Sequence, residues 1–212
     1  MKRELQKKKN ELEKALSKML KEKIKAYKFK KKDYMIWFNK GDLFFDLLID
    51  VGVTADERCL CNTVETIKPL WLDELLWDFL EMESNKEQPM SLRSIGAFTV
   101  HGSELYSDSC GLENWDVADL EACVDKYLEH FKKTIDNADI NTYLDNIKTN
   151  PYHLELREAL TLVHNEQYLE AYNYLKDKSK GRFKNGDIHI NDSIREYCKE
   201  KLEHLEKFYK NK

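Results

Sequence analysis

The sequence predicts an α+β fold, in which a small antiparallel sheet is packed by helices and followed by an all-helical C-terminal extension. Two observations support this prediction. Apolar residues alternate with a period of two between residues 34 and 66, and they recur at helical spacing before and after that region. With 212 residues, 42% of them hydrophobic, the chain is also long enough to bury a sizeable core.

An amphipathic helix is predicted for residues 4–27. Its apolar residues are spaced to line one helical face, while lysines occupy the other faces. These apolar residues are Leu5, Leu12, Leu16, Met19, Leu20, Ile24 and Tyr27. The pattern leaves open whether this basic helix packs against the rest of the protein or extends from it as a free arm.

An antiparallel meander is predicted to follow the helix. Residues 34–38 form the first strand, Gly41 can supply the positive φ of a hairpin turn, and residues 43–53 form a long second strand. Residues 57–66 are read as the third strand and residues 94–101 as the fourth. Asp46 and Asp50 share one face of the long strand, which we expect to be solvated.

Two further helices are predicted to pack on this sheet together with the first one. A short buried helix spans residues 70–82 after Pro69, and a polar loop follows at 83–91. A long helix runs from Asp116, a good N-cap residue, to about residue 135, and its apolar residues recur at helical spacing throughout.

The C-terminal part of the chain is predicted to be helical throughout. Asn150 followed by Pro151 is typical of an N-cap and a first helical position, so we divide the chain into an α+β domain over 1–148 and a helical extension over 149–212. We expect a helical hairpin over 153–178. Ser193 and Glu196 have the spacing of a capping box before a last helix.

Charge is distributed very unevenly along the chain. Residues 1–32 carry a net charge of +10, residues 33–145 carry −16, and residues 146–212 carry +2. A concentrated acidic field selects and accelerates encounter with basic surfaces. We therefore expect a non-catalytic binding protein, of the immunity or adaptor type, that engages a basic protein partner. Its candidate contacts are acidic residues at predicted loops and helix ends: Glu81, Glu83, Glu104, Asp108, Glu113 and Asp116.

Two other readings of these charges stay open. The acidic side chains can simply solvate the surface, with the basic N-terminal helix folded back on them. Alternatively, the basic segment 1–32 binds nucleic acid, through Lys28, Lys30, Lys31 and Lys32 with aromatic residues interleaved to stack on bases. The same lysines also fit a helix end that enters a protected edge strand, and we favour that structural reading.

Known catalytic and cofactor motifs are missing from the sequence. The six histidines show no metal-ligand spacing, the seven glycines offer little for a phosphate cradle, and Cys59 and Cys61 lack a matching second pair. We therefore predict no catalytic residue, no cofactor and no metal. An enzymatic hypothesis would need Asp46, Asp50 and His101 to line one pocket.

The expected location is the cytoplasm. No apolar run approaches the roughly 20 residues that span a bilayer, and no apolar segment typical of a secretion signal follows the basic start. The odd count of five cysteines argues against a disulfide framework, so we expect reduced thiols.

The first third of the chain resembles a bacterial family of proteins of unknown function. The resembling features are a helix leading into residues 27–32, the aromatic strand 34–38, the turn at 41–42 and the end of the long strand at 50–53. The glycine usual in that family before its Phe-Lys-Lys motif is Lys28 here. The resemblance implies an α+β fold and transfers no catalytic residues.

Overall fold

The computed structural model describes residues 3–210, and the chain divides into two compact units. The first unit contains the described residues up to Pro69 together with Gly102–Thr149. The second contains Leu70–His101 together with the described residues from Asn150 onward. Residues 70–101 therefore group with the C-terminal helices, whereas the sequence-based division assigned them to the N-terminal domain.

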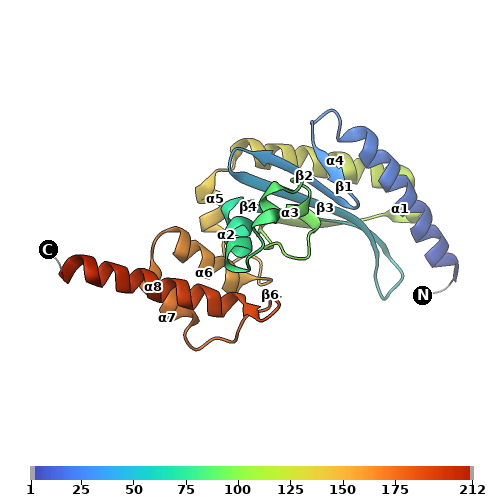
Figure 1. Cartoon of the computed structure of the whole chain (residues 1–212). Coiled ribbons are helices and arrows are strands. Elements are labelled where there is room, and N and C mark those ends of the chain that lie inside the picture. Colours follow the sequence, from blue (N-terminus) through green and yellow to red (C-terminus); the bar gives the residue numbers. More distant parts are fainter. Residues whose placement is uncertain (1–2, 211–212) are drawn as a thin grey trace. The chain divides into compact units, whose positions relative to one another are not determined.

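The first unit is built on a five-stranded antiparallel sheet, as the predicted α+β fold requires (Figure 1). The strands follow one another in chain order, so each hairpin or connection joins spatial neighbours. Their bounds are β1 Lys30–Lys32, β2 Met35–Lys40, β3 Leu43–Val53, β4 Cys59–Pro69 and β5 Ser103–Gly111.

The alternation in β3 determines which side of the sheet faces the core. Phe45, Leu47, Ile49 and Val51 are all buried and share one face of the strand. On the opposite face Asp50 is exposed, but Asp46 is only 7% exposed. The expectation of a fully solvated face is therefore wrong at Asp46.

Helices α1 (Arg3–Lys23) and α4 (Val117–Asn137) contact each other and both contact β3. The predicted apolar stripe of α1 is buried at Leu12, Leu16 and Leu20. The basic N-terminal helix is therefore packed and is not a free arm. Asp116 caps α4 as predicted, because its side chain accepts a hydrogen bond from the backbone N–H of Ala118.

The strand predicted for residues 94–101 lies later in the chain, as β5. Residues 94–101 contain no strand, and the short helix α3 (Leu92–Ile95) occupies part of that range. The backbone N–H of Val100 donates to the carboxylate of Asp73 at 2.7 Å instead of joining a sheet. The chain enters the sheet at Ser103, and a register irregularity accompanies this pairing between Glu65 and Thr66 of β4.

The second unit is mainly helical. Its elements are α2 Trp71–Phe79, η1 Glu83–Glu87, α3, α6 Leu154–His164, α7 Tyr168–Leu175, β6 Lys184–Asn185, β7 Ile188–His189 and α8 Ile190–Lys210. The predicted helical hairpin is confirmed as α6 and α7. Helix α2, which we expected to pack on the sheet, contacts α6 and α8, so it belongs to the core of the second unit.

Two predicted helix starts are wrong. Helix α6 begins at Leu154 rather than at Pro151, and the side chain of Asn150 accepts from the backbone N–H of Tyr152 in a local turn. Helix α8 begins at Ile190, so Ser193 lies inside it and donates to the His189 carbonyl. Helix α8 follows β7 directly, and its first N–H groups, those of Ile190 and Asn191, donate to the carbonyls of Phe183 and Lys180.

Candidate functional site

The predicted acidic contacts are divided between the two units. Glu104 and Asp108 lie on β5, and Glu113 and Asp116 lie in the connection from β5 to α4. These four belong to the first unit. The remaining two, Glu81 and Glu83, follow α2 in the second unit and are both exposed.

Asp108 is the most strongly bound of the six carboxylates. Its Oδ2 accepts from Lys126 Nζ at 2.7 Å and from the Tyr106 hydroxyl at 3.0 Å. The hydrogen bond from Lys126 lowers the pKa of Asp108 to about 2, and the same bond raises the pKa of Lys126. Asp108 is therefore ionised at neutral pH, but its charge is locally compensated.

The other three carboxylates of the first unit differ in whether they are already bound within the protein. Asp116 is committed to capping α4, and Glu104 accepts from the Ser107 hydroxyl at 2.7 Å. Glu113 is exposed and makes no ion pair within residues 3–210. Glu104 and Glu113 are thus the carboxylates of this set with capacity for a new partner.

The basic N-terminal helix neutralises part of the acidic surface. Lys23 Nζ lies 2.7 Å from Asp125 and 2.9 Å from Glu121 on α4. The hydrogen bond to Asp125, and then that to Glu121, raises the pKa of Lys23. The helix therefore folds back on acidic residues, which was the alternative reading of the charge pattern.

The basic alternative site retains exposed charge but loses its aromatic partner. Lys28, Lys30 and Lys32 are exposed, whereas Lys31 is half-buried and its ammonium donates to the Asp33 carbonyl. Phe29 is only 5% exposed. Its ring stacks on Tyr27 at 5.2 Å and meets Phe131 edge-on at 5.1 Å, so Phe29 is committed to the core.

This arrangement confirms the structural reading of the segment. The helix end leads into β1, which pairs only with β2 and forms one edge of the sheet. Lysines on an edge strand discourage pairing with a second sheet.

A buried glutamate on β4 that pairs with a histidine on α4 was not recognised from the sequence. Glu65 is fully buried, with its two oxygens accepting from Thr134 and contacting His130 Nδ1, each at 2.8 Å. The Tyr106 ring stacks on the His130 ring with centroids 3.9 Å apart. Burial raises the pKa of Glu65, against the opposing hydrogen bonds from His130 and Thr134.

A signal for this burial was present in the strand parity. Glu65 lies on the same side of β4 as Cys59, Cys61, Thr63 and Ile67, all of which are buried. The carboxylate is thus placed under α4, where it ties the helix to the sheet.

The residues named in the enzymatic hypothesis belong to different units. Asp46 and Asp50 belong to β3 in the first unit, whereas His101 belongs to the second unit. His101 is not on a strand beside Cys59, and its ring contacts Tyr152 and His153 instead. Across the described part of the chain, no group of three or more His, Cys, Asp or Glu residues is arranged to hold a metal ion.

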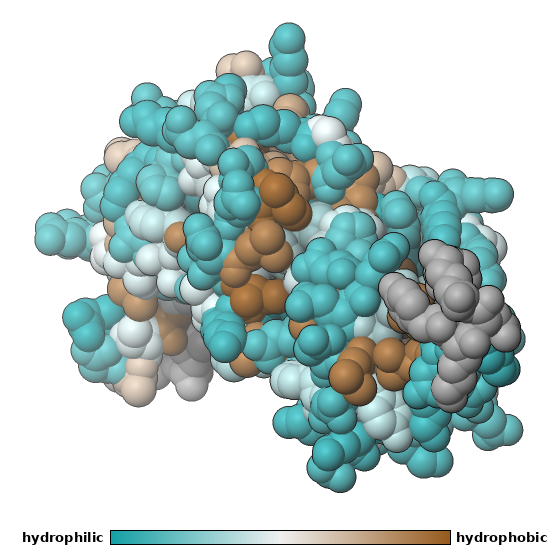
Figure 2. Space-filling model, turned by 90° about the vertical axis from the view of Figure 1, so that its left-hand side faces the viewer, coloured by the Kyte–Doolittle hydropathy of each residue, from teal (hydrophilic) through white to brown (hydrophobic). Residues whose placement is uncertain are grey.

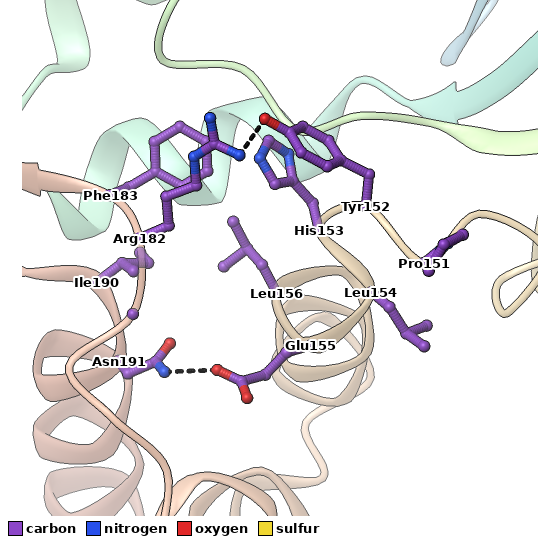
Figure 3. Close-up of a pocket in the computed structure, with 11 residues that line it drawn as sticks. Pro151, Tyr152, His153, Leu154, Glu155, Leu156, Arg182, Phe183, Ile190 and Asn191 are labelled. Atoms are coloured by element: carbon purple, nitrogen blue, oxygen red, sulfur yellow. Dashed lines mark hydrogen bonds between the residues drawn. The ribbon is translucent and has the colours of Figure 1, made fainter.

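The second unit contains a pocket of about 290 Å³ at the start of α6 and α8 (Figure 3). Arg182 and Tyr152 lie at one end, Glu155 and Asn191 at the other, and Leu156 lies between them (Figure 3). The full lining comprises Pro151, Tyr152, His153, Leu154, Glu155, Leu156, Gly181, Arg182, Phe183, Ile190 and Asn191.

A fully buried arginine shapes this pocket. The Arg157 guanidinium donates to the carbonyls of His101 at 3.0 Å, Tyr152 at 2.6 Å and Asn150. These bonds hold residues 150–153 in a turn and leave His153 with a φ of 60°. They also explain why α6 starts at Leu154 and not at the proline.

The polar groups of the pocket are engaged with one another. Arg182 lies over the Tyr152 ring at 4.7 Å and donates to its hydroxyl, while Asn191 donates to Glu155 at 2.8 Å. One cation, one carboxylate and several aromatic faces are therefore present together. This combination does not define a ligand class, so we assign no function to the pocket.

The molecular surface offers few apolar features. Figure 2 shows a mostly hydrophilic face with separate groups of hydrophobic side chains. Exposed large hydrophobic residues include Ile140 and Leu144 on α5 (Ile140–Asp145) in the first unit, and Leu169 and Leu205 in the second. None of the helices formed by residues 3–210 combines the length and apolar character needed to cross a membrane.

Comparison of the chain with protein-family models, with curated proteins and with solved structures found no match. The resemblance of the first third to a bacterial family of unknown function therefore stays a prediction.

Proposed function

We propose that this is a non-catalytic binding protein that engages a basic protein partner through an acidic surface of its first unit. The surface comprises Glu113 and the solvent-facing carboxylates at the start of α4, and Glu104 at the other end of β5 is a second, separate candidate contact. The proposed role is of the immunity or adaptor type, in which one protein masks or recruits another, and the proposed compartment is the bacterial cytoplasm.

One observation carries the proposal. Residues 102–125 contain seven acidic side chains and no lysine or arginine. They lie along β5 and the first half of α4, but Glu104 pairs with Thr66 across the register shift and so lies on the sheet face opposite α4. Lys126 and Lys23 compensate Asp108, Glu121 and Asp125, so the uncompensated carboxylates lie in two places: Glu104 where β5 begins, and Glu113 and Asp119 near the start of α4. Such a field favours encounter with basic surfaces and disfavours nucleic acid.

The nucleic-acid alternative has weaker support. Lys28, Lys30 and Lys32 remain available for phosphates, but Phe29 is buried and cannot stack on bases. Lys31 is half-buried, and burial followed by repulsion from Lys21 lowers its pKa. Of the two rings inside the segment, Phe29 is in the core and Tyr27 is half-buried against it, so a structural role fits better than base recognition, although Tyr34 just after β1 is 62% exposed.

The proposal can be tested by capturing partners from lysate of the source cells on three versions of the tagged protein. The test variant is Glu104→Gln with Glu113→Gln. The matched control, Asp42→Asn with Asp50→Asn, removes the same charge from exposed positions elsewhere in the first unit. Nuclease-treated lysate excludes capture through nucleic acid.

The expected result is one identified basic protein that binds the wild type and the control but is lost from the test variant at the same salt concentration. Equal retention by both variants would contradict the proposed surface. Capture that disappears with nuclease, and with Lys30→Ala and Lys32→Ala, would favour the nucleic-acid alternative. A further variant, Glu81→Gln with Glu83→Gln, asks whether the second unit contributes.

A further inference from the structure

Three of the five cysteines gather between β4, β5 and α4. Cys61 on β4 lies directly opposite Cys110 on β5 in the register of the antiparallel pair. Cys123 approaches from α4, where burial and then the nearby Cys110 thiol raise its pKa to about 11. The neighbouring α4 residue Tyr127 donates to the Cys61 carbonyl at 3.1 Å, which fixes the helix over this pair.

The register of Cys61 and Cys110 satisfies the geometric requirement for a disulfide. Directly opposite residues of antiparallel strands have Cα atoms roughly 4.5 to 5.5 Å apart. A disulfide spans Cα separations of about 4.4 to 6.8 Å. Bridging the two residues therefore needs side-chain rotation and only a small approach of the strands, because a disulfide brings the Cβ atoms to about 3.5 to 4.5 Å and opposite strand residues hold them at about 4.5 to 5.5 Å.

The two thiols differ in access. Cys61 is fully buried, and burial raises its pKa, so it stays protonated in the folded protein. Cys110 is partly exposed on the last strand of the sheet. Lys126 Nζ lies 3.7 Å from its sulfur and faces the charge of a thiolate, while Asp108 lies 3.8 Å away and offsets that cation. An oxidant from solvent therefore meets Cys110 first.

We propose that Cys110 and Cys61 form an oxidation site that closes a cross-strand disulfide when the protein meets a peroxide. The Cys110 sulfur attacks one peroxide oxygen, the O–O bond breaks, and the leaving hydroxide takes a proton to become water. The Cys61 sulfur then attacks the resulting sulfenic acid. Its S–O bond breaks, and the second hydroxide leaves with the Cys61 proton as water. Two thiols lose two electrons in total, and one hydrogen peroxide is reduced to two waters.

The bridge would tie the edge strand β5 to β4 at the start of β4 and the end of β5, which is the opposite end of the strand pair from the connection through the second unit. The chain leaves the first unit after Pro69 at the end of β4 and returns at Gly102 before β5. Joining Cys61 to Cys110 covalently fixes this strand pair while the intervening segment belongs to the second unit. The oxidised protein is expected to protect the β5 amides more strongly from hydrogen exchange than the reduced protein.

The test is peptide mapping of the full-length protein without reduction, before and after treatment with hydrogen peroxide. When a labelling reagent is applied after denaturation, we expect two of the five thiols to have become unreactive, and we expect a linked pair of peptides that contain Cys61 and Cys110. Mapping the wild-type protein needs no substitution, so the result does not depend on a variant that folds.

Two variants provide the matched comparison. Cys61→Ala is expected to abolish the cross-link and to leave Cys110 as a sulfenic acid that a dimedone probe captures. Cys123→Ala removes the third thiol and is expected to leave the Cys61–Cys110 link intact. A Cys110–Cys123 link in the wild type, or five thiols that stay reactive after peroxide treatment, would overturn the proposal.

Discussion

The packing of α1 is open to a direct test by truncation of its buried face. Leu20 is 2% exposed, and it lies with Leu16 on the face of α1 that covers the sheet. Replacing a buried leucine by alanine removes its transfer free energy and leaves a cavity, at a cost of about 2 to 5 kcal/mol. We expect Leu20→Ala to lower the free energy of unfolding by about 3 kcal/mol.

The assay is urea unfolding followed by circular dichroism. With a slope near 2 kcal/mol per molar urea, a loss of about 3 kcal/mol moves the unfolding midpoint down by roughly 1.5 M. Lys18→Ala is the matched control, because Lys18 is an exposed residue of the same helix and alanine favours helix formation. The control is expected to shift the midpoint little.

Equal midpoints for Leu20→Ala and Lys18→Ala would refute the reasoning, since a helix that extends freely loses no burial on truncation. That outcome would also restore the basic helix as an arm available to nucleic acid. A large loss on Leu20→Ala keeps the helix in the core of the first unit.

Three further predictions concern the buried Glu65 and Arg157 and the exposed Lys40. Because burial raises the folded pKa of Glu65 above its ordinary 4.5, its carboxyl contributes stability that is fully present below about pH 4.5 and is lost as pH rises through the raised pKa. The stability of the wild type relative to Glu65→Gln should thus fall with pH in urea titrations; a constant difference contradicts the assignment. Arg157→Met should cost roughly 3 kcal/mol by thermal unfolding, because several carbonyls lose their donor, and exposed Arg182→Met should cost far less. Lys40→Met removes the donor to the carbonyls of Ile135, Asp136 and Ala138 at the end of α4. Hydrogen exchange of the amides there should speed up by a factor that corresponds to about 1 kcal/mol. Unchanged exchange would show that these bonds contribute nothing.

Periodicity predicted the elements that have one continuous apolar face. The long strand β3 and the helices α1 and α4 each have a clear apolar face, and their type and approximate bounds follow from that face alone. The edge strand β5 escaped prediction because it is mostly polar and only partly buried. Its position depends on pairing with β4, which is a tertiary property.

The same limit explains the misplaced helix starts. Asn150 and Pro151 give a strong local signal for a helix start, but the buried guanidinium of Arg157 binds the carbonyls of Asn150 and Tyr152 and holds a turn there. The same guanidinium also donates to the carbonyl of His101, which is 56 residues earlier in the chain. No local sequence pattern reveals that contact. The hydrogen bonds of Arg157 therefore outweighed the local preference for a helix start at Pro151.

The candidate site was predictable as a charge pattern but not as a surface. The sequence identified the acidic segment and its candidate residues. It did not show that Asp108 and Asp116 are already used, or that Glu81 and Glu83 belong to a different unit from Glu104 and Glu113. Lys126 on α4 pairs with Asp108 on β5, and Lys23 on α1 pairs with Asp125 on α4. Each pair joins residues that are far apart in the sequence, so only the fold reveals it.

The most direct test of the proposed function is zero-length carbodiimide cross-linking of the wild-type protein with its captured partner, followed by identification of the joined peptides. Carbodiimide joins carboxylates to lysine amines only where they touch, so it reports which acidic side chains contact the partner. The account predicts links from Glu104 and Glu113 to lysines of the partner. Links that come only from carboxylates outside the β5–α4 surface, or from Lys28, Lys30 and Lys32 to carboxylates of the partner, would contradict it.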